Sequence, residues 1–161
     1  MGESPKSTRK KMIEAFWKSC GDHIPMEDWN ASFSSWSFGD SAELADKLLA
    51  LVLSGVKTAT CGTLFDYEAD NEVPPEEGSY HILTDFAGIP HCLIQITSVT
   101  LSPFRDVPMD FALAEGEGSY EEWREAHIKF FNRRAEETSN TFDGDTVLVL
   151  EHFKVVYAKI N

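Results

Sequence analysis

Residues 38–65 read FGDSAELADKLLALVLSGVKTATCGTLF, and the change from a helical to a strand-like residue pattern inside this stretch decides the fold class. Its first half predicts the clearest helix of the chain, in which Asp40 can cap the start, Glu43 completes a capping box and Gly55 stands where a C-terminal glycine belongs. Its second half, from Lys57, is rich in threonine, which favours strands. A helix followed directly by a buried strand indicates a mixed fold.

The other segments extend this mixture in both directions. Two β-branched runs around the Gly-Pro turn of residues 87–90 predict a hairpin. The remaining predictions are helices over 7–20, 107–116 and 119–137, an acidic loop over 66–78, and one or two strands over 144–160. The helices and strands alternate too irregularly for a repeated strand–helix–strand array. We therefore predict an α+β fold, with a small mixed or barrel-like sheet and helices packed on it.

Composition excludes several classes of protein. The 161 residues, 42% of them apolar, suit one domain with a buried core. The longest apolar run carries charges and is too short to cross a membrane, and the basic N-terminus has no apolar segment after it to make a secretory signal. Cys20, Cys61 and Cys92 form no CxxC pair, which fits free thiols in a reducing cytoplasm. The five histidines lack metal-site spacing, so we expect a cytoplasmic protein with no metal or other cofactor and no membrane partner.

The net charge of −13 is unevenly distributed. Residues 1–18 hold five Lys/Arg against Glu3 and Glu14, which makes a local +3 and leaves −16 on the rest of the chain. Such a body repels long polyanions, because contacts to phosphates supply most of the affinity for nucleic acids. A small, nearly neutral substrate meets no such barrier. The charge therefore counts against a nucleic-acid partner, although a local basic patch could still bind one.

The stretch SGVKTATCG, residues 54–62, is the first candidate for chemistry. Lys57 has an ordinary interpretation, a surface lysine at a helix C-terminus. In the chemical interpretation Lys57 supplies a cation or a base, and Thr60 supplies a hydroxyl nucleophile. Side chains three apart in a regular strand point to opposite faces, so this interpretation requires irregular backbone over 56–58. Cys61 is expected to be a small buried side chain, because nothing nearby in the sequence lowers its pKa.

Two further segments carry candidate residues. Glu115 and Glu117 lie among glycines in AEGEG, which is either a solvated acidic turn or a sharp bend that brings a carboxylate close to a partner. Trp36 and Phe38 lie in WSFGD and are expected to pack in the core before the following helix. If one of these rings lines a pocket instead, its natural task is to stack on a base.

Taken in order, these motifs resemble the ASCH family, particularly its longer bacterial branch. The resemblance covers Phe33 to Tyr157 and is carried by WSFGD, SGVKTATCG, GSYHILTDFAGIPHCLIQITSVTLSPFRDV, FALAEGEGSYEEWREAHIKFF and DTVLVLEHFKVVY. It implies a β-barrel related to the PUA fold, with helices around a cleft. It also implies an ASCH domain over 33–161 with an N-terminal helical extension over 1–32.

Members of the family are linked to RNA binding or modification. A short branch is similar to amidohydrolases that remove the acetyl group from N4-acetylcytidine, and the resemblance assigns their catalytic roles here to Lys57, Thr60 and Glu117. Another member is similar to a single-strand ribonuclease that also depends on the lysine. Substrate-binding roles are expected for Trp36, Phe38, Glu115 and Arg124.

Three hypotheses follow. The first is a hydrolase of a small nucleoside-type amide, in which Thr60 attacks, Glu117 carries the proton and Lys57 remains a cation. The second is an RNA-binding module or ribonuclease, with the N-terminal segment and Lys57, Arg105, Arg124 or Arg133 along one groove. The third is a ligand sensor without catalysis. The expected partner is a nucleoside-like ligand or single-stranded RNA, and the oligomeric state, a homodimer among the options, stays open.

Overall fold

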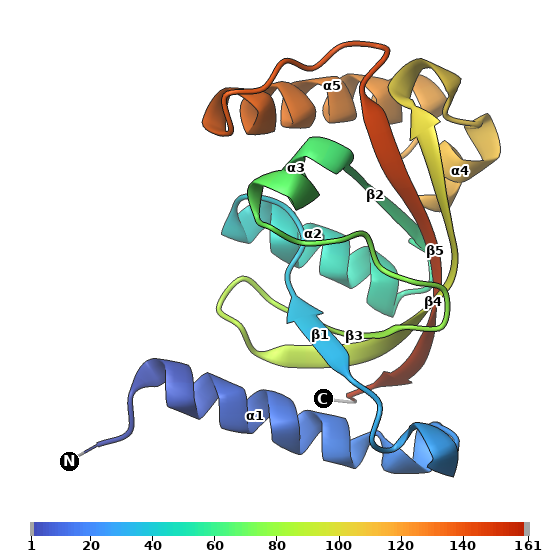
Figure 1. Ribbon diagram of the computed structural model, residues 1–161. Helices are drawn as coiled ribbons and strands as arrows, with labels where there is room; N and C mark the ends of the chain where they lie inside the picture. Colours follow the sequence, from blue (N-terminus) through green and yellow to red (C-terminus); the bar gives the residue numbers. More distant parts are fainter. Residues whose placement is uncertain (1, 160–161) are drawn as a thin grey trace. The chain divides into compact units, whose positions relative to one another are not determined.

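Helices and strands are interspersed along the chain in the computed structural model, which describes residues 2–159 (Figure 1). The helices are α1 (Pro5–Ser19), α2 (Ala42–Leu53), α3 (Leu64–Ala69), α4 (Met109–Ala114) and α5 (Tyr120–Glu137). The strands are β1 (Phe33–Trp36), β2 (Ala59–Thr63), β3 (Tyr80–Thr84), β4 (Pro90–Pro103) and β5 (Val147–Ala158). Three short 3₁₀ turns lie at Gly21–His23, Met26–Asp28 and Phe104–Asp106.

Hydrogen bonds join the five strands into a mixed sheet in the order β1-β3-β4-β5-β2. The pair β1–β3 is parallel, whereas β3–β4 and β2–β5 are antiparallel. The α+β class and the predicted hairpin of β3 and β4 are confirmed. The expected barrel is corrected to an open sheet, because β1 and β2, of four and five residues, stand at opposite ends of the strand order among residues 2–159.

The chain divides into two compact units. The first comprises the chain up to Gly55, Gly78–Ile96 and the chain from Lys154, and the second comprises Val56–Glu77 and Thr97–Phe153. β4 and β5 each contribute residues to both units. The separation of an N-terminal extension at residue 32 from a domain over 33–161 stays a prediction.

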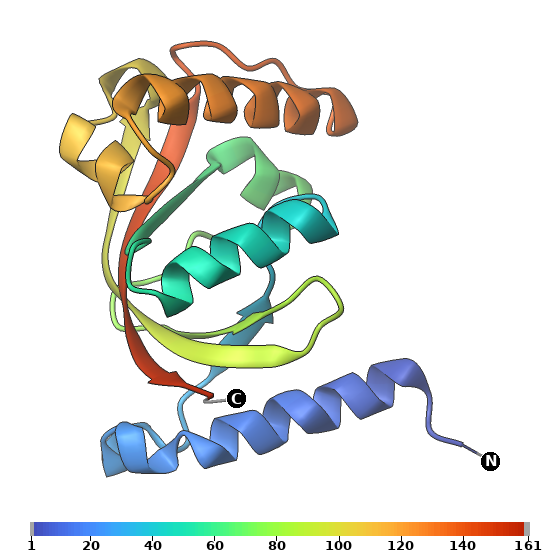
Figure 2. The ribbon, with the colours of Figure 1, turned by 180° about the vertical axis from the view of Figure 1, so that it is seen from behind.

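In the first unit, α1 packs against the hairpin of β3 and β4. Phe16 of α1 and Cys20, the C-cap residue of this helix, belong to one buried cluster with Tyr80, Ile82 and Leu93 of the hairpin. Figures 1 and 2 show α1 running beneath this hairpin in both views. The helical spacing seen in the sequence over 7–20 therefore serves to cover one face of the hairpin, as an amphipathic helix should.

In the second unit, α4 and α5 lie side by side, as both views show (Figures 1 and 2). Trp123 and Phe131 of α5 are fully buried in a cluster with Phe111 and Ala112 of α4 and with the strands β2 and β5. The capping box predicted at the start of α5 is confirmed, with Ser119 and Glu122 bonded reciprocally. This helix pair positions the residues that follow α4 against the start of β2.

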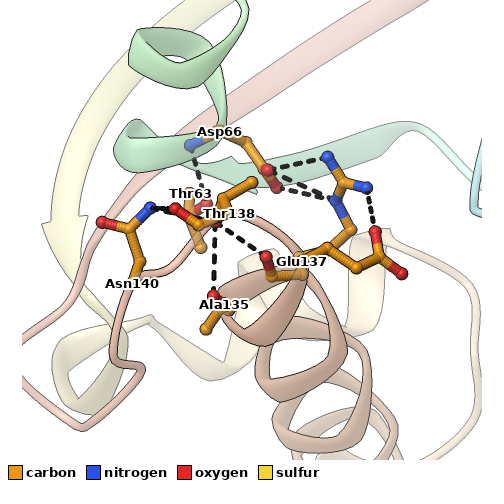
Figure 3. Close-up of polar contacts among 7 residues, drawn as sticks. Thr63, Asp66, Ala135, Glu137, Thr138 and Asn140 are labelled. Atoms are coloured by element: carbon orange, nitrogen blue, oxygen red, sulfur yellow. Dashed lines mark hydrogen bonds and ion pairs between the residues drawn. The ribbon is translucent and has the colours of Figure 1, made fainter.

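The helix α3 is joined to the last turns of α5 (Figure 3). Thr63 accepts a hydrogen bond from the Asp66 amide at 3.3 Å and so caps α3. The Asp66 carboxylate pairs with the Arg134 guanidinium, with contacts of 3.0 Å to Nη2 and 3.2 Å to Nε. The fork of the guanidinium suits a carboxylate, so this pair defines the direction of approach as well as the contact.

Two local predictions are corrected, and one segment without a predicted element proves to be a strand. The N-cap of α2 is Ser41, whose hydroxyl accepts the Leu44 amide, and Asp40 lies one residue too early, because Ser41 is the extended residue directly before the helix. The predicted acidic loop begins as α3, since Thr63 supplies a cap. The segment before α2 is a strand, β1, because it pairs with β3.

Candidate functional site

The backbone before β2 is irregular, as the chemical interpretation of Lys57 requires. β2 begins only at Ala59, and residues 56–58 belong to no helix or strand. The Thr58 amide donates to the Ala114 carbonyl at 2.8 Å, and the Thr58 carbonyl accepts from the Phe153 amide at 3.1 Å. These two bonds attach the start of β2 to the end of α4 and to β5.

Lys57 is buried, with 2% of its surface exposed. Its Nζ donates to the Ala59 carbonyl at 2.8 Å and to Glu115 Oε1 at 3.1 Å. Because the Thr58 carbonyl faces β5, the Ala59 carbonyl points to the other side, where β2 is an edge of the sheet. The ammonium group therefore satisfies an edge carbonyl and a buried carboxylate together.

Glu115 is the centre of the buried polar cluster. It follows the last residue of α4 and is 1% exposed. Oε1 accepts from Lys57, and Oε2 accepts from the Trp123 indole N–H, from Cys61 Sγ at 3.3 Å and from His127 Nε2 at 3.1 Å. Burial by itself would raise the pKa of this carboxyl. Lys57, His127 and Trp123 outweigh burial and bring the pKa down to about 2. A carboxylate held in this way is an anchor for cations and a poor base.

His127 is held between acceptors on both ring nitrogens. Nδ1 lies 2.8 Å from the Trp123 carbonyl, and Nε2 lies 3.1 Å from Glu115 and 3.7 Å from Glu117. Two facing acceptors are satisfied only when both nitrogens carry protons. Burial lowers the pKa of the imidazole, but the hydrogen bond and charge of Glu115 and the charge of Glu117 outweigh burial and raise it above 6.5. His127 is therefore the second cation of the cluster.

Gly116 is the turn that places these carboxylates. Its φ is +76°, and a Cβ there would lie 2.9 Å from both Cγ1 and the carbonyl oxygen of Val56. Only glycine adopts this conformation without strain and leaves room for the neighbouring chain. The sharp bend suspected in AEGEG is thus real, and it brings Glu115 to Lys57 and Glu117 to His127.

Thr60 lies directly opposite Glu151 in the pair β2–β5. Glu151 is buried, at 4% exposed, and its Oε2 accepts from the Tyr67 hydroxyl at 3.1 Å. Burial is the main reason that the pKa of Glu151 rises to about 7, with Glu115 adding to the rise while Tyr67 and Lys57 oppose it. Sequence reasoning missed Glu151 because a lone glutamate in an apolar strand carries no motif. Its burial in a run such as VLVLEHF is the signal that could have pointed to it.

Of the other residues of the second unit that the sequence singled out, Glu117 and Cys61 contact this cluster, whereas Arg124 contacts the Phe104 ring. Glu117 joins it through His127. Cys61 is a partly buried neutral thiol, since desolvation and the charge of Glu115 raise its pKa well above 9. Arg124 is exposed on α5 and lies 5.8 Å from the centre of the Phe104 ring. Its role in substrate binding stays a prediction, as do the catalytic roles of Lys57, Thr60 and Glu117.

Trp36 and Phe38 belong to the first unit. The Trp36 indole N–H donates to His81 Nδ1 at 2.9 Å, and Phe38 packs edge-on against Trp36 and is 5% exposed. The Phe38 ring is therefore core, as the ordinary interpretation of WSFGD holds. Contact of either ring with a substrate stays a prediction.

His81 and Ser79 resemble a nucleophile–base pair but have the wrong proton arrangement. His81 Nδ1 accepts from Trp36, so its Nε2 carries the proton and donates to Ser79 Oγ at 3.0 Å. Burial lowers the pKa of His81 to about 4, which keeps the ring neutral. A base for Ser79 would need a bare Nε2, so we assign no catalysis to this pair.

One group of metal-type ligands lies in the described part of the chain: Cys61, Glu115 and His127 offer atoms within 4.8 Å of one another. These atoms already bond to each other, the thiol is protonated, and Lys57 places a positive charge 3.1 Å from the carboxylate. A metal ligand set needs a thiolate and a neutral imidazole. The donor set does not fit a metal ion.

Comparison with known proteins supports the fold as a whole. The family model described as the ASCH domain matches residues 34–157. The structure is similar to an ASCH domain from Lactobacillus crispatus JV V101, at 37% identity and a TM-score of 0.80 over 92% of this chain and 94% of that one. It is also similar to a protein from Enterococcus faecalis V583, at 34% identity and a TM-score of 0.80 over 94% of this chain and 96% of that one. No protein of curated function matches the chain. Among residues 2–159, every helix is too short or too polar to cross a membrane.

Proposed function

Because the chain belongs to the ASCH domain family, we propose that it hydrolyses a small acylated amine of the nucleoside type, such as N4-acetylcytidine. The observation that carries the proposal is the buried ion pair of Lys57 and Glu115. Lys57 lies just before β2 and three residues before Thr60, whose hydroxyl is the proposed nucleophile. A cation preorganised in a site of low dielectric stabilises the oxyanion that forms when an amide carbonyl is attacked.

Each residue has a distinct role in the proposed reaction. Thr60 Oγ attacks the acyl carbon and forms an ester, which water then hydrolyses. Lys57 remains a cation and supports the developing negative charge, while Glu115 holds it in place. Glu117, which contacts the His127 imidazolium at 3.7 Å, is the predicted carrier of a proton to the leaving amine. The net charge of the whole chain, −13, favours a neutral substrate over a polyanion.

The test is release of cytidine from N4-acetylcytidine by the purified protein and by Lys57→Met, Thr60→Ala and Glu117→Gln. Turnover in the parent is expected, with a loss of about 100- to 1000-fold in kcat for Lys57→Met, the magnitude typical of a lost oxyanion donor. Circular dichroism of each variant separates lost chemistry from lost fold. A parent that leaves this amide and related acylated amines intact would refute the proposal.

A second candidate function, binding of single-stranded RNA, is favoured by one observation in the first unit. A groove of about 450 Å³ is lined by Arg9, Lys10, Ile13, Glu14, Phe33, Ser35, Thr84 and Gly88. Two cations beside an aromatic ring suit a phosphate and a base. The same groove contains Glu14, and the Phe33 ring is already stacked on Trp17 at 4.6 Å, so we rank this function second.

A further inference from the structure

We propose that Glu151, a residue outside every motif of the sequence, is the base that takes the Thr60 hydroxyl proton. The inference rests on the proposed function, since it concerns the nucleophile of that reaction. It departs from the prediction that Glu117 carries the proton. Three independent features of the second unit carry it: strand register, the face on which each carboxyl lies, and the contrast between two buried carboxyls.

Register places the two side chains next to each other. Thr60 and Glu151 are directly opposed in an antiparallel pair, so their side chains project to the same face of the sheet. The bond from the Phe153 amide to the Thr58 carbonyl, two residues away along each strand, makes this pair one of the hydrogen-bonded kind. Directly opposed Cβ atoms lie about 4.5–5.5 Å apart, a separation that a glutamate side chain spans to a threonine hydroxyl.

The other carboxylates lie with the opposite face. Ala59 and Cys61 belong to the hydrophobic cluster under α4 and α5, so by strand alternation Thr60 points away from that cluster. Glu115 bonds to Cys61 and to Trp123 inside the cluster. Glu117 reaches His127, whose ring stacks on Trp123 at 4.4 Å. Glu151 therefore shares a face with the Thr60 hydroxyl that Glu115 and Glu117 do not share, while Lys57 lies at the edge of β2, where its Nζ bonds to the Ala59 carbonyl.

The protonation of the two buried carboxyls differs as an acid–base pair requires. Glu115 is an anion at all ordinary pH values, with a pKa of about 2, whereas the pKa of Glu151 is about 7. A group with a pKa near the working pH can both accept and return a proton. Tyr67 bonds to Oε2 of Glu151, which directs that oxygen and leaves Oε1 to accept from Thr60.

The steps balance with water as the second reactant. The Thr60 Oγ–H bond breaks, its proton goes to the Glu151 carboxylate, and Oγ bonds to the acyl carbon while the carbonyl electron pair becomes the oxyanion. The oxyanion collapses, the C–N bond breaks, and the amine leaves with the proton that Glu151 took from Thr60, which restores the Glu151 carboxylate. Water then attacks the Thr60 ester and gives a proton to Glu151. Glu151 passes that proton to Thr60 Oγ as the ester C–O bond breaks, which releases the carboxylic acid and the free Thr60 hydroxyl.

The experiment separates this inference from the identity of the substrate. The parent protein, Thr60→Ala, Glu151→Gln and Tyr67→Phe are treated with p-nitrophenyl acetate across a pH series, and acetylation of Thr60 is followed by intact mass and peptide mapping. Release of cytidine from N4-acetylcytidine is measured on the same samples. Glu125→Gln, which removes an exposed carboxyl on α5, is the matched control.

Acetylation of Thr60 is expected in the parent, with a rate that rises through a pH near 7 and falls about 100- to 10,000-fold in Glu151→Gln. Tyr67→Phe should move the rise to higher pH, because the lost hydrogen bond favoured the ionised carboxylate. A purely structural role for Glu151 would not produce that shift. Glu125→Gln should behave as the parent.

The two proposals fail in different ways. Acetylation of Thr60 that depends on Glu151, without amide turnover, supports the inference and refutes the amide as substrate. Turnover of the amide that survives Glu151→Gln but is lost in Glu117→Gln supports the function and overturns the inference. Absence of both acetylation and turnover in a folded parent overturns both.

Discussion

Lys57 shows how one residue determines the organisation of its surroundings. A buried ammonium group needs a compensating charge, and Glu115 supplies it at 3.1 Å while the Ala59 carbonyl takes a second hydrogen bond. Glu115 in turn accepts from Lys57, from Cys61 of β2, and from Trp123 and His127 of α5. The cluster is thus a closed set of partners, in which loss of one side chain leaves another charge uncompensated.

Glu115→Gln should lower the free energy of unfolding by about 3–5 kcal/mol, because it leaves Lys57 buried without its counter-ion. Urea unfolding followed by fluorescence measures the loss. The double variant Lys57→Met with Glu115→Gln removes both charges and should be more stable than Glu115→Gln alone. With Lys57→Met measured alone as well, the cycle gives a coupling energy for the pair. An unchanged urea midpoint in Glu115→Gln would show that the pair is not a structural anchor.

Glu151 makes stability depend on pH in a direction opposite to most carboxyls. Its pKa is about 7 in the folded protein and ordinarily 4.5, so the folded state binds more protons between these values. Stability from this group is complete below about pH 4.5 and is lost as the pH rises through 7, by about 3 kcal/mol in all. Glu151→Gln should flatten unfolding free energies measured across this window.

A part of the slope should remain in Glu151→Gln. The pKa of His127 is also raised by folding, and such a group likewise loses its stabilising contribution as the pH rises above its folded value. If the parent itself gains stability from pH 4.5 to 7, the burial of Glu151 does not control its ionisation.

At the scale of elements, the turn from α4 to α5 decides where the carboxylates lie. Two glycines with positive φ, Gly116 and Gly118, separate the helices, and the first passes close to Val56. The turn thus serves to join the acidic segment to the start of β2. Exposed acidic turns need no such close approach, so the glycines of the AEGEG segment have a structural role beside any chemical one that we propose.

Gly116→Ala should destabilise the protein by about 1–3 kcal/mol more than Gly55→Ala does. Both glycines have a positive φ, of +76° and +82°, so both variants incur backbone strain. Only at Gly116 would the new Cβ meet other atoms, at 2.9 Å, whereas nothing lies within 4 Å at Gly55. Thermal unfolding of the two variants compares strain alone with strain plus a clash. Equal losses would exclude the close approach.

The link between α3 and α5 offers a second test at this scale. Asp66→Asn removes the charge that pairs with Arg134 but keeps the backbone amide that Thr63 caps. We expect a loss of about 1 kcal/mol, since the pair is bidentate but partly exposed. Glu137→Gln, which removes the more exposed partner of the same arginine, should change stability by less. The order of the two urea midpoints checks the prediction.

At the scale of the whole molecule, charge separates the two candidate functions. The chain carries −13, and its N-terminal 18 residues carry +3. Hydrolysis of an uncharged amide should change little between about 50 and 200 mM salt, whereas binding of RNA to the basic segment should weaken steeply as counterions are released. Steady-state rates and RNA titrations at matched salt concentrations make the comparison. Turnover that falls with salt as steeply as RNA binding would point to a charged substrate.

Local patterns in the sequence determined the class of the fold and most of its elements. Helical spacing over 7–20, the capping box at Ser119 and Glu122, and the β-branched runs around the Gly-Pro turn each express interactions within a few residues. Partners far along the chain decided the rest: β1 is a strand because it pairs with β3, and the sheet is open because β1 and β2 stand at opposite ends of the strand order.

The same division holds for the candidate site. Sequence motifs singled out Lys57, Thr60, Glu115 and Glu117 as candidates, because a cation close to a hydroxyl and a carboxylate beside flexible glycines can meet at one site, and the family resemblance then assigned catalytic roles to Lys57, Thr60 and Glu117. Only the tertiary structure made Glu115 the partner of Lys57, added His127 to the cluster and set Glu151 opposite Thr60. The physical reason is that strand register and burial, which govern these contacts and the pKa values, depend on residues that the sequence separates and the fold brings together.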